Sequence, residues 1–229
     1  MRHRKITIAI DGPAASGKST TARRVARKLN YVYIDTGAMY RAVTLAALHN
    51  NIPVDDTEQM GTLAASINIE LYQNDSDTEI FLDGTDVSRD IRLPEVTQNI
   101  SPVAANARVR EILVAKQQQL GKNGGVVMDG RDIGTVVFPE AELKIFMEAS
   151  VEERARRRIR ELRERGVVME IGVVESEIRQ RDEADQNRDH GPLRKAPDAI
   201  SIDTTTLSID EQVAKIVLLA RRIISSQSL

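Results

Sequence analysis

Short apolar runs alternate along this chain with longer stretches in which apolar residues recur at the spacing of a helix. The runs are rich in β-branched residues, which is typical of buried strands, and they lie at residues 5–10, 31–34, 124–128, 143–147 and 199–202. The helical stretches lie between them, at residues 18–29, 38–50, 58–65, about 94–121, 174–187 and 209–224. We expect the stretch at 94–121 to be broken near Ser101 and Pro102. Strands that alternate with helices predict an α/β fold, in which a parallel sheet is flanked by helices in three layers.

A different pattern occupies residues 67–87. Apolar and polar residues alternate over residues 67–71, and strand-like runs return after a turn-rich segment at 74–77. Asp83 and Gly84 stand between two of these runs, and Asp-Gly is a strong hairpin signal because both turn residues must accept positive φ. We therefore expect a small antiparallel β insert of three strands.

An arginine-rich helix is predicted after the run at 143–147. Ser150 is placed to cap it, and Glu152 and Glu153 lie in the first turn, where the helix dipole favours anions. Gly166 is placed to end it. We expect two or three of its seven arginines to reach a ligand and the others to form a solvated face; they are Arg154, Arg156, Arg157, Arg158, Arg160, Arg163 and Arg165.

The composition excludes several classes of protein. The chain has 229 residues, of which 41% are apolar, so it can bury a sizeable core. It has no cysteine, which excludes disulfides, thiolate nucleophiles and zinc–thiolate sites. A formal charge of −2 and 3% aromatic residues count against nucleic acid as a partner. No segment approaches the roughly 20 apolar residues of a membrane span, and the first apolar run is too short for a signal peptide. We expect a cytoplasmic monomer.

Residues 12–19, GPAASGKS, match the phosphate-binding pattern G-x-x-x-x-G-K-[ST] between a predicted strand and a predicted helix start. Small residues such as Ala14 and Ala15 let consecutive backbone amides curl around a polyphosphate, and the helix start adds its positive end. Lys18 would reach the β- and γ-phosphates, and the Ser19 hydroxyl would hold Mg²⁺. An ordinary glycine-rich turn is the alternative. The motif indicates nucleotide binding but does not identify the acceptor of the phosphate.

Further clusters of charged residues suit a second, small anion. Residues 35–41 and residues 129–132 directly follow predicted strands, and so lie at the edge of the sheet where α/β proteins bind ligands. Arg181, Asp185 and Arg188 share one helix face. Guanidinium groups suit phosphate because they bind two oxygens and keep their charge.

Each of these clusters also has a structural interpretation. The row that ends at Arg188 fits a surface ladder of ion pairs, Arg41 fits a solvated helix position, and Asp129 fits a cap on the turn after its strand. The three histidines show no metal-ligand spacing. An Asn-Lys-x-Asp motif that would indicate a guanine-binding GTPase is absent from the sequence.

Taken together, the motifs resemble those of the bacterial cytidylate kinases, which are nucleoside monophosphate kinases with a phosphate-binding loop. The resemblance spans essentially the whole chain and rests on IAIDGPAASGKST, IDTGAMYRAV, SPVAANARVRE, MDGRDIGTVVFP, RQRDEADQNR and SIDTTTLSIDE. It implies a P-loop NTPase-like fold with an arginine-rich helical lid. It also implies ATP and Mg²⁺ as cofactors, and CMP and dCMP as the acceptors that are converted to CDP and dCDP.

The resemblance implies roles for particular residues. The phosphates of ATP would contact Gly12, Pro13, Ala14, Ala15, Ser16, Gly17, Lys18, Ser19 and Thr20. Cytosine would be read by Thr36, Arg110 and Asp132. The sugar would be held by Ser101, Arg181 and Asp185, and the acceptor phosphate by Arg41, Arg131 and Arg188. We expect the catalytic groups to be Lys18, Arg131, Arg188 and a lid arginine such as Arg157. Mg²⁺ would be held by Ser19, and through water by Asp129.

On this interpretation residues 1–229 form a single kinase domain. Its core is expected at 1–63, 93–152 and 173–229, with the β-rich insert at about 64–92 and the lid at about 153–172. Two alternatives remain open from the residues alone. One is a kinase for another small acceptor, such as UMP, AMP or a sugar acid. The other is a non-catalytic ATP-binding switch or an RNA-associated module that uses the arginine-rich helix.

Overall fold

The five apolar runs form one parallel sheet. The computed structural model describes residues 5–73, 78–164 and 166–226. The strand order is β2-β6-β1-β7-β8, and every neighbouring pair is parallel, as predicted. Each strand lies within two residues of its predicted run: β1 (Thr7–Asp11), β2 (Val32–Asp35), β6 (Val126–Gly130), β7 (Leu143–Glu148) and β8 (Ile200–Asp203).

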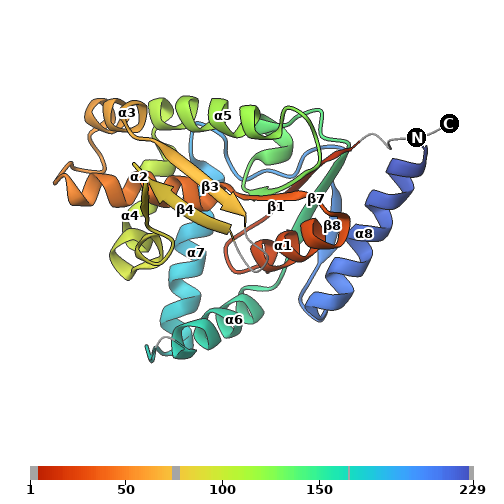
Figure 1. Ribbon diagram of the computed structural model, residues 1–229. Coiled ribbons are helices and arrows are strands. Elements are labelled where there is room, and N and C mark those ends of the chain that lie inside the picture. The colour runs from red at the N-terminus through yellow and green to blue at the C-terminus, as the bar shows by residue number, and fades with distance from the viewer. Residues whose placement is uncertain (1–4, 74–77, 165, 227–229) are drawn as a thin grey trace.

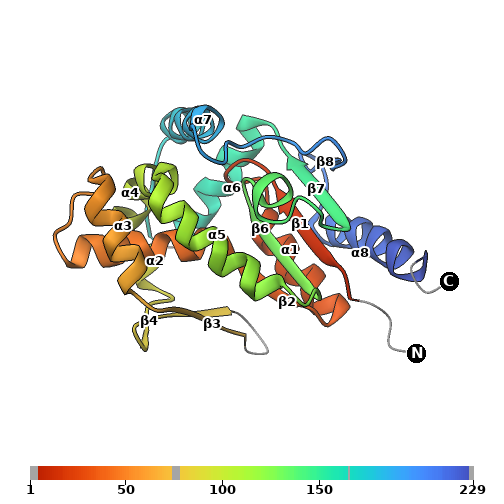
Figure 2. The same cartoon turned by 90° about the horizontal axis from the view of Figure 1, so that it is seen from above.

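Alternation of side chains along β1 places helices on both faces of the sheet. Ile8 and Ile10 pack in one hydrophobic cluster with residues of α1 and α8. Ala9 points to the other face, where Val114 of α5 packs against its cluster. Figure 2 shows the strands between α5 and α8. The three predicted layers are therefore present, and these helices are α1 (Lys18–Leu29), α5 (Ala107–Gly121) and α8 (Ile209–Ser226).

The segment between β2 and β6 builds a second hydrophobic cluster beside the sheet (Figure 1). Its small sheet is antiparallel, in the order β3-β4-β5, which confirms the predicted insert. Asp83 and Gly84 form the predicted turn with φ of 49° and 81°, whereas the predicted turn at 74–77 lies outside the described residues. The elements are α2 (Thr36–His49), α3 (Thr57–Ser66), β3 (Ile69–Gln73), β4 (Thr78–Leu82), β5 (Thr85–Asp86), a 3₁₀ turn (Asp90–Arg92) and α4 (Pro94–Ala105).

The predicted break near Ser101 and Pro102 is wrong. Both residues lie inside α4, which continues to Ala105, because a proline within a helix removes one hydrogen bond without necessarily ending it. The chain breaks instead at Asn106, whose backbone is extended and whose side chain accepts hydrogen bonds from the amides of the second and third residues that follow, at 3.0 and 3.2 Å. This N-cap begins α5.

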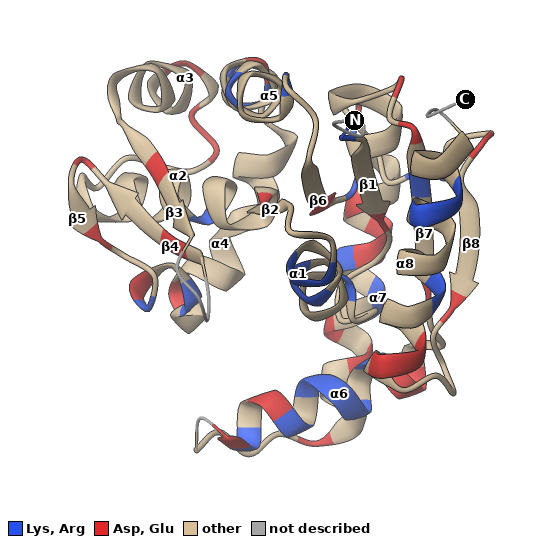
Figure 3. Cartoon of the chain, turned by 45° about the vertical axis from the view of Figure 1, so that its right-hand side comes forward, with Lys and Arg blue, Asp and Glu red and all other residues tan. Residues whose placement is uncertain are grey.

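The arginine-rich helix α6 (Val151–Glu164) packs against α7 (Ile171–Asn187) through a small hydrophobic cluster. The Ser150 hydroxyl accepts a hydrogen bond from the Glu153 amide at 3.2 Å, as the sequence predicts for a cap. Gly166 has a φ of 77° and donates to the Arg163 carbonyl at 2.9 Å, which confirms the predicted helix end. Figure 3 shows α6 extending from the body of the molecule with basic and acidic bands along it. Arg165 lies outside the described residues.

All carboxyl ends of the main strands meet at one edge of the sheet because the strands are parallel. The phosphate-loop residues follow β1, α2 follows β2, and α6 follows β7. β6 leads into a π-helical turn (Ile133–Val137) that the sequence pattern does not predict. None of the described helices is long and apolar enough to cross a membrane.

Candidate active site

The loop after β1 folds back so tightly that its first residue must be glycine. Gly12 has a φ of 150°, and a Cβ atom there would lie 2.1 Å from the Met147 carbonyl oxygen. Ala15 and Gly17 also have positive φ, at 57° and 93°. When right- and left-handed backbone conformations alternate, successive N–H groups point to the same side of the loop. They then form a concave anion-binding site, called a nest.

Lys18 lies buried at the start of α1, with its amine folded over this loop. Its Nζ donates to the Pro13 carbonyl at 2.6 Å and to the Ser16 hydroxyl at 3.3 Å. Burial, and next the positive charge of Arg131, lower the pKa of Lys18 to about 7. A polyanion that enters the loop would raise the pKa of this amine again, because negative charge favours the protonated form.

Asp129, at the end of β6, connects the loop to the centre of the sheet. One carboxylate oxygen accepts a hydrogen bond from Ser19 at 2.8 Å, and the other accepts one from Tyr33 at 2.7 Å. Burial, and next the negative charge of Asp35, raise the pKa of Asp129. Hydroxyl and carboxylate oxygens are the donors that Mg²⁺ prefers. No group of three acidic or histidine side chains suited to a metal occurs among the described residues.

A buried ion pair occupies the place that the sequence assigns to base recognition. Arg110 from α5 pairs with Asp132, and its other Nη donates to the Tyr40 hydroxyl at 3.2 Å. Arg188 approaches the second oxygen of Asp132 at 3.6 Å. Gly191 covers the pair, since a Cβ atom there would lie 2.0 Å from Arg110 Nη2. Burial raises the pKa of Asp132, and the positive charge of Arg110 opposes that rise.

A second group of arginines lies between this pair and Lys18. Arg131 Nε donates to Asp185 at 2.6 Å, and Arg188 lies 3.9 Å from the other oxygen of the same carboxylate. Arg41 Nη2 pairs with Asp35 at 3.0 Å. Asp185 is buried, so the surface-ladder interpretation of this row is wrong.

Two of these arginines keep unused hydrogen-bond donors. Arg181 donates no hydrogen bond to any described residue. Burial, and next the positive charge of Arg131, lower its pKa to about 10, while the Asp185 carboxylate opposes this fall. Arg131, Arg41 and Arg158 are the positive neighbours that contribute. Arg41 Nε is buried without a partner in the described chain. A crevice with surplus buried positive charge and free guanidinium donors is suited to bind phosphate.

Three more of the predicted site residues have different surroundings. The Thr36 hydroxyl donates to the Asp129 backbone oxygen at 2.7 Å, so it can contact a ligand as a hydrogen-bond acceptor. Ser101 lies half-buried on α4 and its hydroxyl forms no hydrogen bond within the described chain. Arg157 clamps the outside of the phosphate loop, since its Nη1 donates to the Ser16 carbonyl at 3.1 Å and its Nη2 to the Thr204 carbonyl at 2.5 Å.

Sequence reasoning missed several residues that shape the site. Arg158, the neighbour of Arg157, is the lid arginine whose charge acts on Arg181. Tyr33 orients Asp129, and Asp11 accepts two backbone amides beside the site. Successive residues of a helix are rotated by about 100° around its axis. A run of arginines in the sequence therefore does not reveal which one faces the crevice. Buried polar residues such as Asp11 at strand ends are the available signal.

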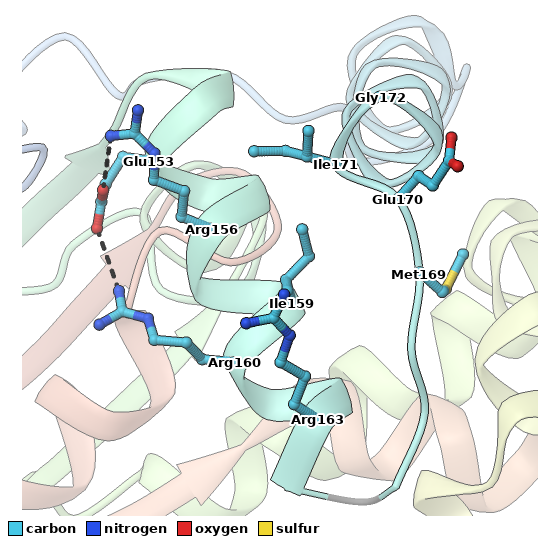
Figure 4. Close-up of a pocket in the computed structure, with 9 residues that line it drawn as sticks. All are labelled: Glu153, Arg156, Ile159, Arg160, Arg163, Met169, Glu170, Ile171 and Gly172. Carbon is cyan, nitrogen blue, oxygen red and sulfur yellow. Dashed lines mark hydrogen bonds and ion pairs between the residues drawn. The ribbon is translucent and has the colours of Figure 1, made fainter.

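A cavity of about 880 Å³ lies on the outer side of the lid. Figure 4 shows Arg156 and Arg160 of α6 both paired with Glu153, while Ile171 from the start of α7 faces Ile159. Neither the phosphate loop nor the ion pairs described above line this cavity. These arginines match the solvated face that the sequence predicts.

Known proteins resemble this chain in sequence and in fold. The family model for cytidylate kinase matches residues 8–222. Curated cytidylate kinases from Bacillus thuringiensis (strain Al Hakam) and Bacillus anthracis (strain CDC 684 / NRRL 3495) are each 53% identical over 214 residues, which cover 93% of this chain and 95% of the relative. Among solved structures, a gluconokinase from Sinorhizobium meliloti 1021 has a TM-score of 0.50 at 14% identity, covering 100% of this chain and 98% of its own. That similarity concerns the fold alone.

Proposed function

Because this chain belongs to the cytidylate kinase family, we propose that its phosphate loop and its buried arginine crevice together transfer the γ-phosphoryl group of ATP to CMP or dCMP. The products are ADP and CDP or dCDP. The observation that carries the proposal is the proximity of the two halves. The charge of Arg131 lowers the pKa of Lys18, and Arg131 shares Asp185 with Arg188, which in turn approaches Asp132.

ATP would bind with its phosphates in the loop at residues 12–20. The backbone N–H groups of the loop would surround the β-phosphate. The Lys18 amine would exchange its hydrogen bonds to the loop for bonds to the β- and γ-phosphates. Ser19, oriented by Asp129, would hold Mg²⁺, with Asp129 itself acting through water. When bound, Mg²⁺ would supply positive charge that offsets the negative charge of the phosphates.

CMP would bind on the far side of Arg131. Thr36, Arg110 and Asp132 would contact the base, and Ser101, Arg181 and Asp185 the sugar. The acceptor phosphate would meet Arg41, Arg131 and Arg188. The ion pairs within the crevice hold these side chains in place and would partly exchange for contacts with the acceptor.

The chemistry needs charge neutralisation more than proton removal. An oxygen of the acceptor phosphate attacks the γ-phosphorus, the new P–O bond forms, and the bond to the bridging β–γ oxygen breaks, so that ADP leaves with the electron pair. A phosphomonoester has a second pKa near ~6 and is already largely dianionic at neutral pH, so no strong general base is required. Arginines on both sides of the transferred group offset the repulsion between the two anions.

The test is an ADP-release assay over a panel of acceptors: CMP, dCMP, UMP, AMP and a sugar acid. We expect CMP and dCMP to give the highest kcat/KM. Lys18→Ala should reduce turnover by about 10³-fold or more while the protein stays folded, because Lys18 neutralises the transferred group. Lys28→Ala, at an exposed position of the same helix, is the matched control. Comparable turnover of UMP, or a Lys18→Ala enzyme of normal activity, would contradict the proposal.

We also propose that the enzyme is a monomer that works in the cytoplasm. Every side chain assigned to either substrate comes from one chain, so the site needs no second subunit. Sedimentation of the active enzyme at assay concentration tests the monomer, and a species of twice 25.4 kDa that carries the activity would contradict it.

A further inference from the structure

The last residue of β1, Asp11, makes two hydrogen bonds to a distant part of the chain. Its side chain is buried, with 4% of the residue exposed. Oδ1 accepts from the Ile133 amide at 2.8 Å, and Oδ2 accepts from the Gly134 amide at 2.7 Å. Both carboxylate oxygens are therefore used on consecutive amides, 122 and 123 residues further along the chain.

These amides begin the π-helical turn that follows Arg131 and Asp132. The turn is closed within itself, since Val136 donates to the Asp132 carbonyl at 2.9 Å and Phe138 to the Ile133 carbonyl at 2.7 Å. The first amides of a helical turn have no partner within that turn, and a buried amide without a partner is costly. Asp11 supplies the missing acceptors from another strand.

The position of Asp11 in the chain gives this contact its significance. Asp11 directly precedes Gly12, the first residue of the phosphate loop, and Asp132 directly precedes the first amide that Asp11 holds. One carboxylate thus joins the backbone that would hold ATP to the backbone that presents Arg131 and Asp132.

We propose that Asp11 is a positioning residue for the acceptor, which fixes Arg131 and Asp132 relative to the phosphate loop without touching either substrate. The proposal rests on the acceptor-binding roles proposed above for Arg131 and Asp132. A carboxylate is suited to the task because both of its oxygens accept hydrogen bonds. An asparagine of the same shape would offer one acceptor and set its NH₂ group against the second amide.

The test compares Asp11→Asn with two reference variants. Asp132→Ala shows what loss of an acceptor contact does. Asp56→Asn is the matched control, because Asp56 also accepts two backbone amides, at 3.1 and 2.9 Å, but starts α3 and carries no site residue. For each protein, KM for CMP, kcat, the ratio of kcat/KM for CMP to that for UMP, and the Kd for ATP alone are measured.

For Asp11→Asn we expect KM for CMP to rise about tenfold or more and the CMP-to-UMP ratio to fall. The Kd for ATP alone should change less than threefold, and Asp56→Asn should behave as the wild type. Equal losses for ATP and CMP, or no change for either, would overturn the proposal. If Asp132→Ala itself leaves CMP use unchanged, the proposed function of the crevice fails instead, so the two failures are distinguishable.

A second variant and a second measurement guard against a folding defect. Amide exchange at Ile133 and Gly134 should accelerate at least tenfold in Asp11→Asn, while exchange within β1 stays slow. Asp11→Ser, which is smaller and retains an acceptor oxygen, should show the same selective effect on CMP. Loss of ATP binding in both variants would overturn the proposal, since Asp11 would then serve stability rather than acceptor positioning.

Discussion

At the scale of single residues, the crevice contains buried ion pairs in addition to its surplus of positive charge. Arg110 and Asp132 are both almost completely buried, so each compensates the other's loss of hydration. Removing one member of such a pair leaves a buried charge without a partner, which costs about 3–5 kcal/mol. Substitutions here therefore change stability and recognition together, and experiments must separate the two.

Asp132→Ala is expected to impair cytosine recognition more than phosphate capture. The predicted result is a fall in the CMP-to-UMP ratio of kcat/KM of about tenfold, because one good hydrogen-bonding contact contributes about 1.4 kcal/mol or more to discrimination. The free energy of unfolding, measured in urea, should also fall, since Arg110 loses its partner. An unchanged ratio with reduced stability would show that the pair is structural only.

Asp11 gives a prediction about pH. Burial raises its pKa from 3.8 to about 7, although the hydrogen bonds from the Gly134 and Ile133 amides oppose this rise. The folded protein then keeps a proton that the unfolded chain releases near pH 4. The free energy of unfolding should therefore fall, relative to that of Asp11→Asn, as the pH rises from about 4 to 7, by up to about 1.4 kcal/mol per pH unit. Urea unfolding at several pH values measures this difference, and a constant difference would contradict the prediction.

The residues differ in how well the sequence predicts them. Lys18 belongs to a motif whose geometry is local, and the structure folds that loop as the motif requires. Asp11 and Tyr33 act through partners more than 90 residues away, and a contact at that separation leaves no local pattern. Arg157 and Arg158 differ only in their rotation about the helix axis, which depends on how α6 packs.

At the scale of elements, the two faces of α6 have separate tasks. Ala155 and Ile159 pack against α7, and this apolar contact fixes the rotation of the helix. Arg158 then lies on the side of the crevice, whereas Arg156 lies on the outer side, beside the lid cavity of Figure 4. The side chain of Arg158 is 31% exposed and that of Arg156 is 57% exposed.

We therefore expect Arg158→Met and Arg156→Met to differ strongly. Both variants remove one guanidinium from the same helix. Arg158 loses its ion pair to Glu161, and Arg156 loses its ion pairs to Glu152 and Glu153. Arg158→Met should lower kcat at least tenfold, because a positioned arginine can contribute up to about 10³–10⁵ to phosphoryl transfer. Arg156→Met should stay within twofold of the wild type. Steady-state kinetics with CMP and ATP measure kcat for both variants. Equal kcat values for the two variants would mean that neither arginine reaches the transferred group.

Element boundaries show where local signals suffice. The cap at Ser150 and the glycine end at Gly166 are local, and both are confirmed. The helix break was predicted near Pro102 but lies at Asn106. A strong N-cap begins a new helix there, whereas a proline within a helix can be tolerated. The sequence pattern does not predict the π-helical turn because the acceptors for its first two amides come from Asp11, on another strand.

At the scale of the whole molecule, the two substrates would meet between two hydrophobic clusters. One packs α1 and α8 on the sheet behind the phosphate loop. The other packs α2 to α5 with the small sheet, so the insert shares its core with the helices around it. The sequence predicts the strands of the insert but not this shared core, because packing between distant segments has no signature in a single run of residues.

Matched cavities in the two clusters should therefore have different functional effects. Leu113→Ala and Ile216→Ala each remove a fully buried side chain and should lower the free energy of unfolding by about 2–5 kcal/mol. Leu113 lies one turn after Arg110 on α5, so its loss should also raise KM for CMP. Ile216→Ala should leave KM for CMP within twofold. Urea unfolding and kinetics at a temperature where both variants are folded provide the measurement.

The surplus cation at Arg181 has a practical consequence at the bench. The Arg181 guanidinium lies near the Asp185 carboxylate but donates no hydrogen bond to any described residue, so sulfate or inorganic phosphate in the buffer should compete with the nucleotide for its donors. Affinities measured in such buffers would then underestimate those in chloride, and purification from ammonium sulfate calls for thorough dialysis before any titration.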